Sequence, residues 1–324
     1  MHPQLMKLLE SARAKRAFDV DTYVNKKCKA INKYFTECGI DSCVVGISGG
    51  VDSAVVLGLL GHASQQPGSP IKRIVAARLP VSGIGTSNQT VASERGGEAI
   101  YRMNVIYGDV IKPWSADLSH GLNSIATMVE HGSTDSHVNR NAWAYGQISS
   151  IIRTPALYYI AALLQDNGNN CAVVVGTTNR SEGAYIGFFG KASDAMVDIQ
   201  PISDIHKSEV YEVAKYLHVP DSIIQAVPAG DVWDGQTDEQ MFGSTYEHLE
   251  LYQLVMTSKV ERIFIGCYLC ADALSELRTH FAAIEKIHKR NAHKYRVGSP
   301  AVHFDIMERT VPGGWEGINL QLIA

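Results

Sequence analysis

An apolar run ends in two glycines, an aspartate and a serine in the stretch VVGISGGVDSA, residues 44–54. Glycines in a turn between a strand and a helix leave backbone N–H groups open to an anion. Ser48 and Ser53 add hydroxyl donors to such a site. The carboxylate of Asp52 would repel a phosphate unless a divalent cation lay between them, and Mg²⁺ commonly bridges carboxylates and phosphates. The stretch therefore predicts a site for a magnesium-bound polyphosphate.

The loop differs from the two commoner nucleotide-binding motifs. It lacks both the G-x-x-x-x-G-K-[ST] pattern and the G-x-G-x-x-G pattern. The pattern S-G-G-x-D-S fixes five positions, so a chance match in a chain of this length is of order one in a thousand. The alternative is a glycine-rich turn in which Asp52 only caps the helix.

The hexapeptide resembles the PP-loop family of ATP pyrophosphatases, which cleave ATP between the α and β phosphates. Members convert a carboxylate or carbonyl oxygen into an adenylate, which a nitrogen or sulfur nucleophile then attacks. Catalytic roles are thereby implied for Ser48, Asp52 and Ser53. The nucleotide contacts implied by the resemblance are Ile47, Ser48, Gly49, Gly50, Val51, Asp52 and Ser53.

A second stretch narrows the resemblance to the ammonia-dependent NAD synthetases, over roughly residues 25–305. Residues 173–207 read VVVGTTNRSEGAYIGFFGKASDAMVDIQPISDIHK. The family has G-T-x-x-x-x-E here, followed by G-F-F-x-K, an acid, D-x-x-P and a lysine. The resemblance implies a homodimeric ligase that uses MgATP, deamido-NAD and ammonia. It also implies an acyl-adenylate intermediate and the products NAD, AMP and pyrophosphate.

Several positions match the nucleotide side of that family. Glu182 and Asp52 correspond to magnesium ligands, and two carboxylates that approach each other without a cation would repel. Arg78, Thr177 and Lys207 match positions that contact the nucleotide, and Lys207 is also a candidate catalytic residue. Without the flanking matches, each of these side chains would be read as a solvated loop residue.

The substrate side is implied by the same resemblance. Asp194 is a candidate general base for ammonium deprotonation. Aromatic residues on helices are more often core, and His293 could equally be a surface histidine. The matched positions, several of them contributed across a dimer interface, are Tyr34, Trp143, Tyr158, Lys191, Asp194, His293 and Lys294.

The sequence also departs from the family pattern. Gln147 replaces an asparagine and Ile151 replaces an arginine, although Arg153 lies two residues further on. Ala229 stands where a nucleotide-contacting threonine is usual. The loop after Pro80 reads VSGIGTSNQT instead of a glutamine-rich sequence.

Short β-branched runs alternate with longer helical patterns, which predicts an α/β fold with a doubly wound parallel sheet. The resemblance adds a Rossmann-like, adenine nucleotide alpha-hydrolase-like core with a helical C-terminal extension. We expect one domain over 1–324, with a core at about 25–305 and peripheral segments at 1–20 and 305–324. The expected strands are Cys43–Ile47, Arg73–Leu79, Asn104–Tyr107 and Cys171–Gly176. The expected helices are Asp21–Cys38, Ser53–His62, Thr90–Arg102, Leu118–Val129, Trp143–Leu164 with a kink at Pro155, His206–Leu217, Tyr246–Thr257 and Ala271–Arg290.

Composition limits the possible partners. A net charge of −4 and a pI near 6.3 disfavour nucleic acid, because there is no basic footprint. The sequence contains no apolar run of transmembrane length and no secretory signal, which predicts a cytoplasmic protein without membrane contact. The six cysteines should be reduced. Cys267 and Cys270 form one C-x-x-C, which we interpret as buried helix residues and not as a zinc site.

The nitrogen source follows from the position of the glycine loop. It begins at residue 48, which leaves no room ahead of it for a glutaminase domain. Free ammonia, or ammonia from a separate glutaminase partner, is expected. Two alternatives stay open: another PP-loop enzyme acting on a different carboxylate or on tRNA, and a non-enzymatic nucleotide-binding sensor.

Overall fold

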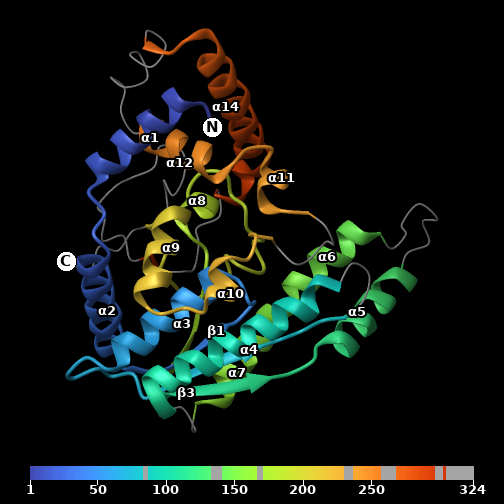
Figure 1. The fold of residues 1–324 in the computed structure, drawn as a ribbon. Coiled ribbons are helices and arrows are strands. Elements are labelled where there is room, and N and C mark those ends of the chain that lie inside the picture. Colours follow the sequence, from blue (N-terminus) through green and yellow to red (C-terminus); the bar gives the residue numbers. More distant parts are fainter. Residues whose placement is uncertain are drawn as a thin grey trace.

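Six parallel strands form one sheet in the order β3-β2-β1-β4-β5-β6 (Figure 1). The computed structural model describes residues 1–82, 87–132, 141–165, 171–229, 236–256, 268–295 and 302–303. The strands are β1 Ile40–Gly46, β2 Arg73–Arg78, β3 Ile111–Ser115, β4 Cys171–Val175, β5 Ile199–Gln200 and β6 Val302–His303. The strand order reverses between β1 and β4, and ligands of such sheets bind at the carboxyl ends of the strands at that point.

Helices connect the strands and extend the chain beyond the sheet. The longer helices are α1 Pro3–Arg16, α2 Val20–Glu37, α3 Val51–Ser64, α4 Ser87–Tyr107, α5 Ser119–His131, α6 Ala142–Ile151, α7 Arg153–Leu163, α9 Lys207–Tyr216, α12 Tyr246–Met256 and α14 Ala271–Asn291. The shorter ones are α8 Arg180–Gly183, α10 Asp221–Ile224, α11 Asp238–Phe242, and the 3₁₀ turns η1 Gly108–Val110 and η2 Ala292–Lys294. The expected α/β class with a doubly wound parallel sheet is confirmed.

One predicted strand is wrong. Asn104–Tyr107 forms the last turn of α4, and the third strand begins only at Ile111. The side chain of Asn104 donates to the carbonyl oxygen of Ile111, and Gly108 turns the chain with a φ of +77°. The strand was missed because it reads IKPWS, and proline is tolerated in a sheet mainly at an edge, which is where β3 lies.

The helix predicted over Trp143–Leu164 is two helices, α6 and α7, which meet at Ile152. Pro155 lies in the first turn of α7, where its missing N–H would have had no intrahelical partner. Proline therefore marks the start of a new helix and does not bend a continuous one.

Two apolar clusters cover the faces of the sheet. On one face α2, α3, α4 and α9 pack on β1 and β2, with Val45, Ile74 and Leu57 at the centre. On the other face α7 packs against Val44 and Val174. Because both faces are covered, the inner residues of the three central strands are apolar, as expected of a parallel sheet: Cys43–Val45 in β1, Ile74–Ala77 in β2 and Ala172–Val175 in β4.

The C-terminal helices α12 and α14 pack with α1 in a separate layer, at the top of Figure 1. Cys270 caps α14 and is exposed, so its expected burial within a helix is wrong, while Cys267 lies outside the described residues. The five cysteines that the structure describes are free thiols. Among the helices of the described residues, none has the length and apolarity needed to span a membrane.

Candidate active site

The loop between β1 and α3 crosses the carboxyl end of β1 and lies against α4. Gly49 has a φ of +90°, and a Cβ there would stand 1.9 Å from the carbonyl oxygen of Ala92. On the same face of α4, a Cβ at Gly96 would approach the carbonyl oxygen of Ile47 to 3.3 Å. The loop can take this path only because the loop and α4 both have small residues at the contact.

Two serine hydroxyls brace the loop from within. The Ser53 hydroxyl donates to the carbonyl oxygen of Gly50 at 3.0 Å, and it accepts the N–H of Ser48 at 3.3 Å. The Ser48 hydroxyl accepts the N–H of Gly50 at 3.2 Å and stays exposed. Gly50 begins α3 without a side-chain cap, so the N–H groups of the first helical turn are available to an anion.

An ammonium group lies between two carboxylates where β1 and β4 end. Lys207 Nζ is 2.6 Å from Asp52 Oδ2 and 3.0 Å from Glu182 Oε1. These residues come from the first turns of α9, α3 and α8. The lysine side chain is only 5% exposed, so the three charges interact with little screening by water. The structure thus brings together three residues that are far apart in the sequence.

Neighbouring polar groups orient both carboxylates. Asn179 Nδ2 donates to Asp52 Oδ1 at 2.8 Å. The Tyr246 hydroxyl lies 2.7 Å from Glu182 Oε1 and 2.9 Å from Asp238 Oδ2. One tyrosine proton cannot fully satisfy two carboxylates, so a proton on one of these acids is favoured.

The pKa values in this cluster follow from burial and charge. Burial raises the pKa of Glu182 to about 7. The positive charge of Lys207 lowers this pKa, whereas the negative charges of Asp52 and Asp238 raise it. Burial also raises the pKa of Asp238. Burial alone would lower the pKa of Lys207, but the charges of Asp52 and Glu182 raise it well above its usual range. Lys207 therefore stays an ammonium ion at neutral pH.

Three acids surround one ammonium group, so the cluster has an excess of negative charge when its acids are ionised. Asp52 and Glu182 approach a common cation from two different helices. Magnesium prefers carboxylate oxygens and is usually held by one or two of them together with substrate phosphates. The side chains present therefore fit a magnesium ion.

Asp238 and Tyr246 belong to this cluster and were missed by the sequence reasoning. Asp238 begins α11 and Tyr246 begins α12, in the helical C-terminal third. Neither follows a strand of the sheet, so the rule that predicts ligands at strand ends does not reach them. No local motif distinguishes them from ordinary residues of a helix start.

Two arginines lie beside the glycine loop. Arg78, the last residue of β2, donates from Nη1 to the carbonyl oxygen of Ser93 at 3.2 Å. Arg95 of α4 donates to the carbonyl oxygen of Gly49 at 3.2 Å and was not predicted. Thr177 follows β4 and is half-buried. Positive charge thus adjoins the N–H groups of the loop, as a polyphosphate site requires.

A second group of predicted residues gathers after α8. Lys294 Nζ donates to the carbonyl oxygens of Gly187 and Phe189 at 2.8 and 2.6 Å. Burial and the charge of Arg290 lower the pKa of Lys294 to about 8, while Asp194 acts in the opposite direction. Asp194 and Lys191 are exposed on this segment.

Asp198, which the sequence reasoning did not identify as a site residue, acts on two of the predicted tyrosines, Tyr158 and Tyr34. Asp198 accepts the Tyr158 hydroxyl at 3.2 Å and the N–H of Val174 at 2.7 Å. Burial, followed by Cys38 and Asp198, raises the pKa of Tyr34 to about 12. The sequence signal that could have identified Asp198 is its position in the D-x-x-P segment, directly before β5.

The other substrate-side predictions do not join these groups. Trp143 is 65% exposed on α6, and His293 is exposed with Nδ1 near the carbonyl oxygen of Arg290. Ile151, which stands where the family has an arginine, is 39% exposed at the end of α6.

Arg153 lies two residues after Ile151, which replaces an arginine of the family pattern, and it contacts two backbone carbonyl groups. It donates from Nε to the carbonyl oxygen of Leu79 at 3.0 Å and from Nη1 to that of Ser149 at 3.1 Å. It therefore ties α7 to the end of β2. Gln147 and Ala229 are half-buried, and part of the loop after Pro80, residues 83–86, lies outside the described residues.

Comparison with known proteins finds relatives over most of the chain. Residues 23–298 match the family described as NAD synthase. The NH(3)-dependent NAD(+) synthetase of Methanococcoides burtonii is 31% identical over 255 residues, covering 78% of this chain and 86% of the relative. The corresponding protein of Thermoplasma volcanium is 30% identical over 275 residues, or 84% of this chain and 95% of the relative.

Solved structures share the fold. The NMN synthetase from Francisella tularensis has a TM-score of 0.64 at 24% identity, covering 86% of this chain and 96% of that one. The NH3-dependent NAD synthetase from Campylobacter jejuni has a TM-score of 0.61 at 20% identity, with the same coverage of both chains.

Proposed function

Because the chain belongs to the NAD synthase family, we propose that it is an ammonia-dependent ligase that makes NAD from deamido-NAD. The observation that carries the proposal is the meeting of Asp52, Glu182 and Lys207 at the point where the strand order reverses. A carboxylate is a poor electrophile at neutral pH, so ATP must first convert it to an acyl adenylate. Ammonia then displaces AMP and forms the amide.

We assign the pyrophosphate of ATP to the loop that begins α3. Its backbone N–H groups and the nearby Arg78 and Arg95 would stabilise the charge that builds up on the leaving group. Lys207 would hold its ammonium group between the phosphates and the two carboxylates. Asp52 and Glu182 would hold magnesium, which when bound neutralises phosphate charge.

We place the nicotinate end of deamido-NAD near the segment after α8. Lys294 supplies a positive charge there, and exposed Asp194 is the candidate that removes a proton from ammonium. Tyr158, hydrogen-bonded to Asp198, and Tyr34 offer aromatic surface to the remainder of the dinucleotide.

We further propose that the protein works as a homodimer in the cytoplasm, as one domain, with free ammonia as the nitrogen source. The helices α5, α6 and α7 pack in sequence and carry large apolar side chains exposed to solvent. These exposed side chains are Ile125, Met128, Val129, Trp143, Ile151, Tyr159 and Leu163. A second copy of the chain would bury such a surface.

The proposal is tested by incubating the purified protein with MgATP and deamido-NAD, adding either ammonium or glutamine, and measuring AMP and NAD. We expect both products with ammonium and neither with glutamine alone. Absence of AMP from folded protein in every mixture would rule the proposal out. Nicotinic acid mononucleotide in place of deamido-NAD distinguishes a mononucleotide substrate from the dinucleotide.

The curated relatives are named synthetases and favour a ligase over the alternative of a non-enzymatic nucleotide sensor. Such a protein would bind ATP without turnover, and the carboxylates of Asp52 and Glu182 would be dispensable. Binding of ATP measured with and without magnesium, in the wild-type protein and in Glu182→Gln, separates a sensor from a ligase.

A further inference from the structure

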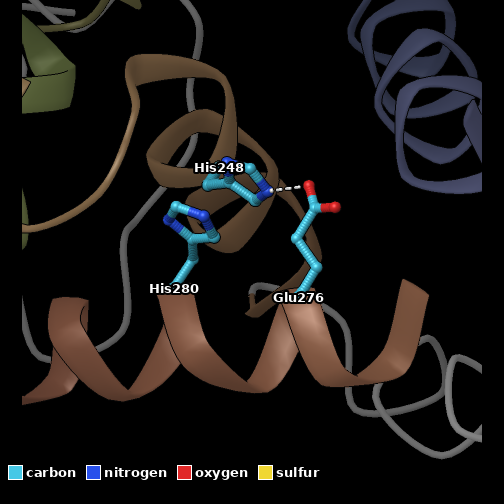
Figure 2. A group of neighbouring side chains, drawn as sticks. All are labelled: His248, Glu276 and His280. Atoms are coloured by element: carbon cyan, nitrogen blue, oxygen red, sulfur yellow. Dashed lines mark hydrogen bonds and ion pairs between the residues drawn. The ribbon is translucent and has the colours of Figure 1, made fainter. Parts of the chain in front are cut away.

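Two histidines and a glutamate that are not part of the proposed active site meet in the C-terminal layer. His248 of α12 faces Glu276 and His280 of α14 (Figure 2). The three ligand atoms that these side chains can offer all lie within 4.8 Å of one another. Among the described residues, this is the group of histidine, cysteine and acidic side chains with the geometry of a metal site.

The backbone brings these atoms together by helical spacing. Glu276 and His280 are four residues apart on α14, so they share one face of that helix. His248 reaches them from the first turn of α12. Its ring lies parallel to that of His280, with centroids 3.6 Å apart and planes 9° apart.

Hydroxyl groups from adjacent residues hold both imidazoles by the same atom. His248 Nδ1 lies 2.9 Å from Thr245 Oγ1, and His280 Nδ1 lies 3.1 Å from Ser244 Oγ. Each ring therefore has its Nε2 left for another partner. Outer hydrogen bonds of this kind orient the histidine ligands of known metal sites.

The carboxylate completes the group and faces solvent. His248 Nε2 is 2.9 Å from Glu276 Oε1, so a proton bridges the two atoms in the absence of another cation. The histidine side chain is 2% exposed and the glutamate side chain 29%, so an ion could enter from the glutamate side. Glu276 Oε1 also accepts the N–H of His2, and the terminal ammonium of Met1 lies 3.9 Å from it. That ammonium opposes a metal and would have to move away from the carboxylate when one binds.

We propose that His248, Glu276 and His280 form a second metal site, which takes a divalent ion of the zinc class. Two imidazoles and one carboxylate suit zinc better than magnesium, which prefers oxygen ligands. The ion would replace the proton between His248 and Glu276, with water in its fourth position. It would join α12 to α14 and thereby brace Tyr246, which lies two residues before His248 and contacts Glu182.

The test is a zinc titration of the chelator-treated full-length protein, followed by calorimetry in excess magnesium so that Asp52 and Glu182 do not report zinc. We expect one equivalent to bind the wild-type protein, and His280→Gln to weaken binding by at least about tenfold, the lower bound for loss of a supporting group in a metal site. The matched control is His120→Gln, which removes an exposed histidine from α5 and should bind zinc as the wild type does.

Cobalt(II) provides a second readout, because a tetrahedral site with nitrogen and oxygen ligands gives a visible absorption band. We expect this band in the wild type and in His120→Gln, and its loss in Glu276→Gln. Thermal unfolding should shift upward with zinc in the wild type and in His120→Gln, and should not shift in Glu276→Gln. Zinc binding that is absent from the wild type, or unchanged in both His280→Gln and Glu276→Gln, would overturn the proposal.

Discussion

At the scale of single residues, the cluster around Lys207 is the part of the site that distance and charge define best. One buried ammonium contacts two carboxylates, and a third acid, Asp238, shares a tyrosine with Glu182. Buried charges are costly unless they are paired, so several acids gathered around one buried lysine mark a candidate functional site. In the proposed reaction, the cluster positions a polyphosphate and its cation.

Removing one carboxylate should impair turnover more than folding. In Glu182→Gln the amide keeps the shape and can still accept from Tyr246, but it offers magnesium no charge. We expect AMP formation to fall by at least about 100-fold, the scale of losing one preorganised electrostatic group. Steady-state rates as a function of magnesium concentration give the measurement, with the exposed Glu10→Gln as control. An unchanged rate would mean that Glu182 has no part in the chemistry.

Lys294 gives the site a pH dependence of defined sign. Its pKa is lowered from 10.5 to about 8, so its positive charge is lost as the pH rises through about 8. If this charge binds the anionic substrate, KM for deamido-NAD should rise above pH 8 while Lys294→Met shows a flat, high KM. The charged groups that act on it are Arg290, Asp194 and Lys191.

Global unfolding cannot mimic this effect. A lysine whose pKa is lowered in the folded state makes folding more favourable as the pH rises from about 8 towards 10.5, because the unfolded chain binds the extra proton. Weaker binding in that window would therefore reflect the site. A wild-type KM that stays constant from pH 7 to 9.5 would contradict the role.

At the scale of elements, the contact between the glycine loop and α4 sets where the loop can lie. Gly49 lies against the backbone of α4. Backbone atoms cannot move aside for an added Cβ as the end of a flexible side chain could. The loop, the start of α3 and the end of β1 are thus positioned by a helix that lies outside the motif itself.

The substitution Gly49→Ala tests this contact. Its Cβ would fall 1.9 Å from the Ala92 carbonyl oxygen at a φ of +90°, so the loop must move. Gly68→Ala is the matched control, because φ there is +77° and nothing lies within 4 Å of the added carbon. We expect both to lose about 1–3 kcal/mol of stability through backbone strain, but only Gly49→Ala to lose ATP turnover. Equal activity losses in the two folded variants would contradict the account.

How much could be predicted from the sequence depended on whether an element carries its own local signal. The strands β1 and β4 are apolar runs that end in glycine, so they were predicted from the sequence, and Asp52 was predicted from the glycine loop after β1. Glu182 was predicted only through the resemblance of residues 173–207 to a known family. The strand β3 was misplaced because IKPWS is short, exposed and contains proline, while the end of α4 is apolar enough to resemble a strand. Asp238 and Tyr246 reach the site through tertiary packing of helices, which no local pattern encodes.

At the scale of the whole molecule, the proposed active site and the proposed dimer contact lie on different sets of elements. The parallel sheet carries the loop and the carboxylates at the carboxyl ends of its strands, while α12 contacts Glu182 through Tyr246 and packs against α14. The helices α5 to α7 leave apolar side chains in solvent, which we assign to contact with a second copy.

That assignment predicts the behaviour of one pair of variants. Val129 on α5 and Val227 beyond α10 are both 68% exposed. A charge at Val129 would be buried without a partner in a dimer, so Val129→Glu should shift the protein towards monomer in light scattering after size exclusion. Val227→Glu should keep the molecular mass of a dimer in the same measurement. A monomeric wild-type protein, or a dimer in both variants, would remove the basis for the interface.

The central claim is that ATP activates a carboxylate of the substrate, and labelled oxygen tests it most directly. Deamido-NAD carrying ¹⁸O in its nicotinate carboxylate would be converted with MgATP and ammonium, and the products examined by mass spectrometry. An acyl adenylate requires one labelled oxygen to leave with AMP, since ammonia breaks the bond between that oxygen and the carbonyl carbon. We therefore predict ¹⁸O in AMP and none in pyrophosphate. Formation of NAD with unlabelled AMP would contradict the account.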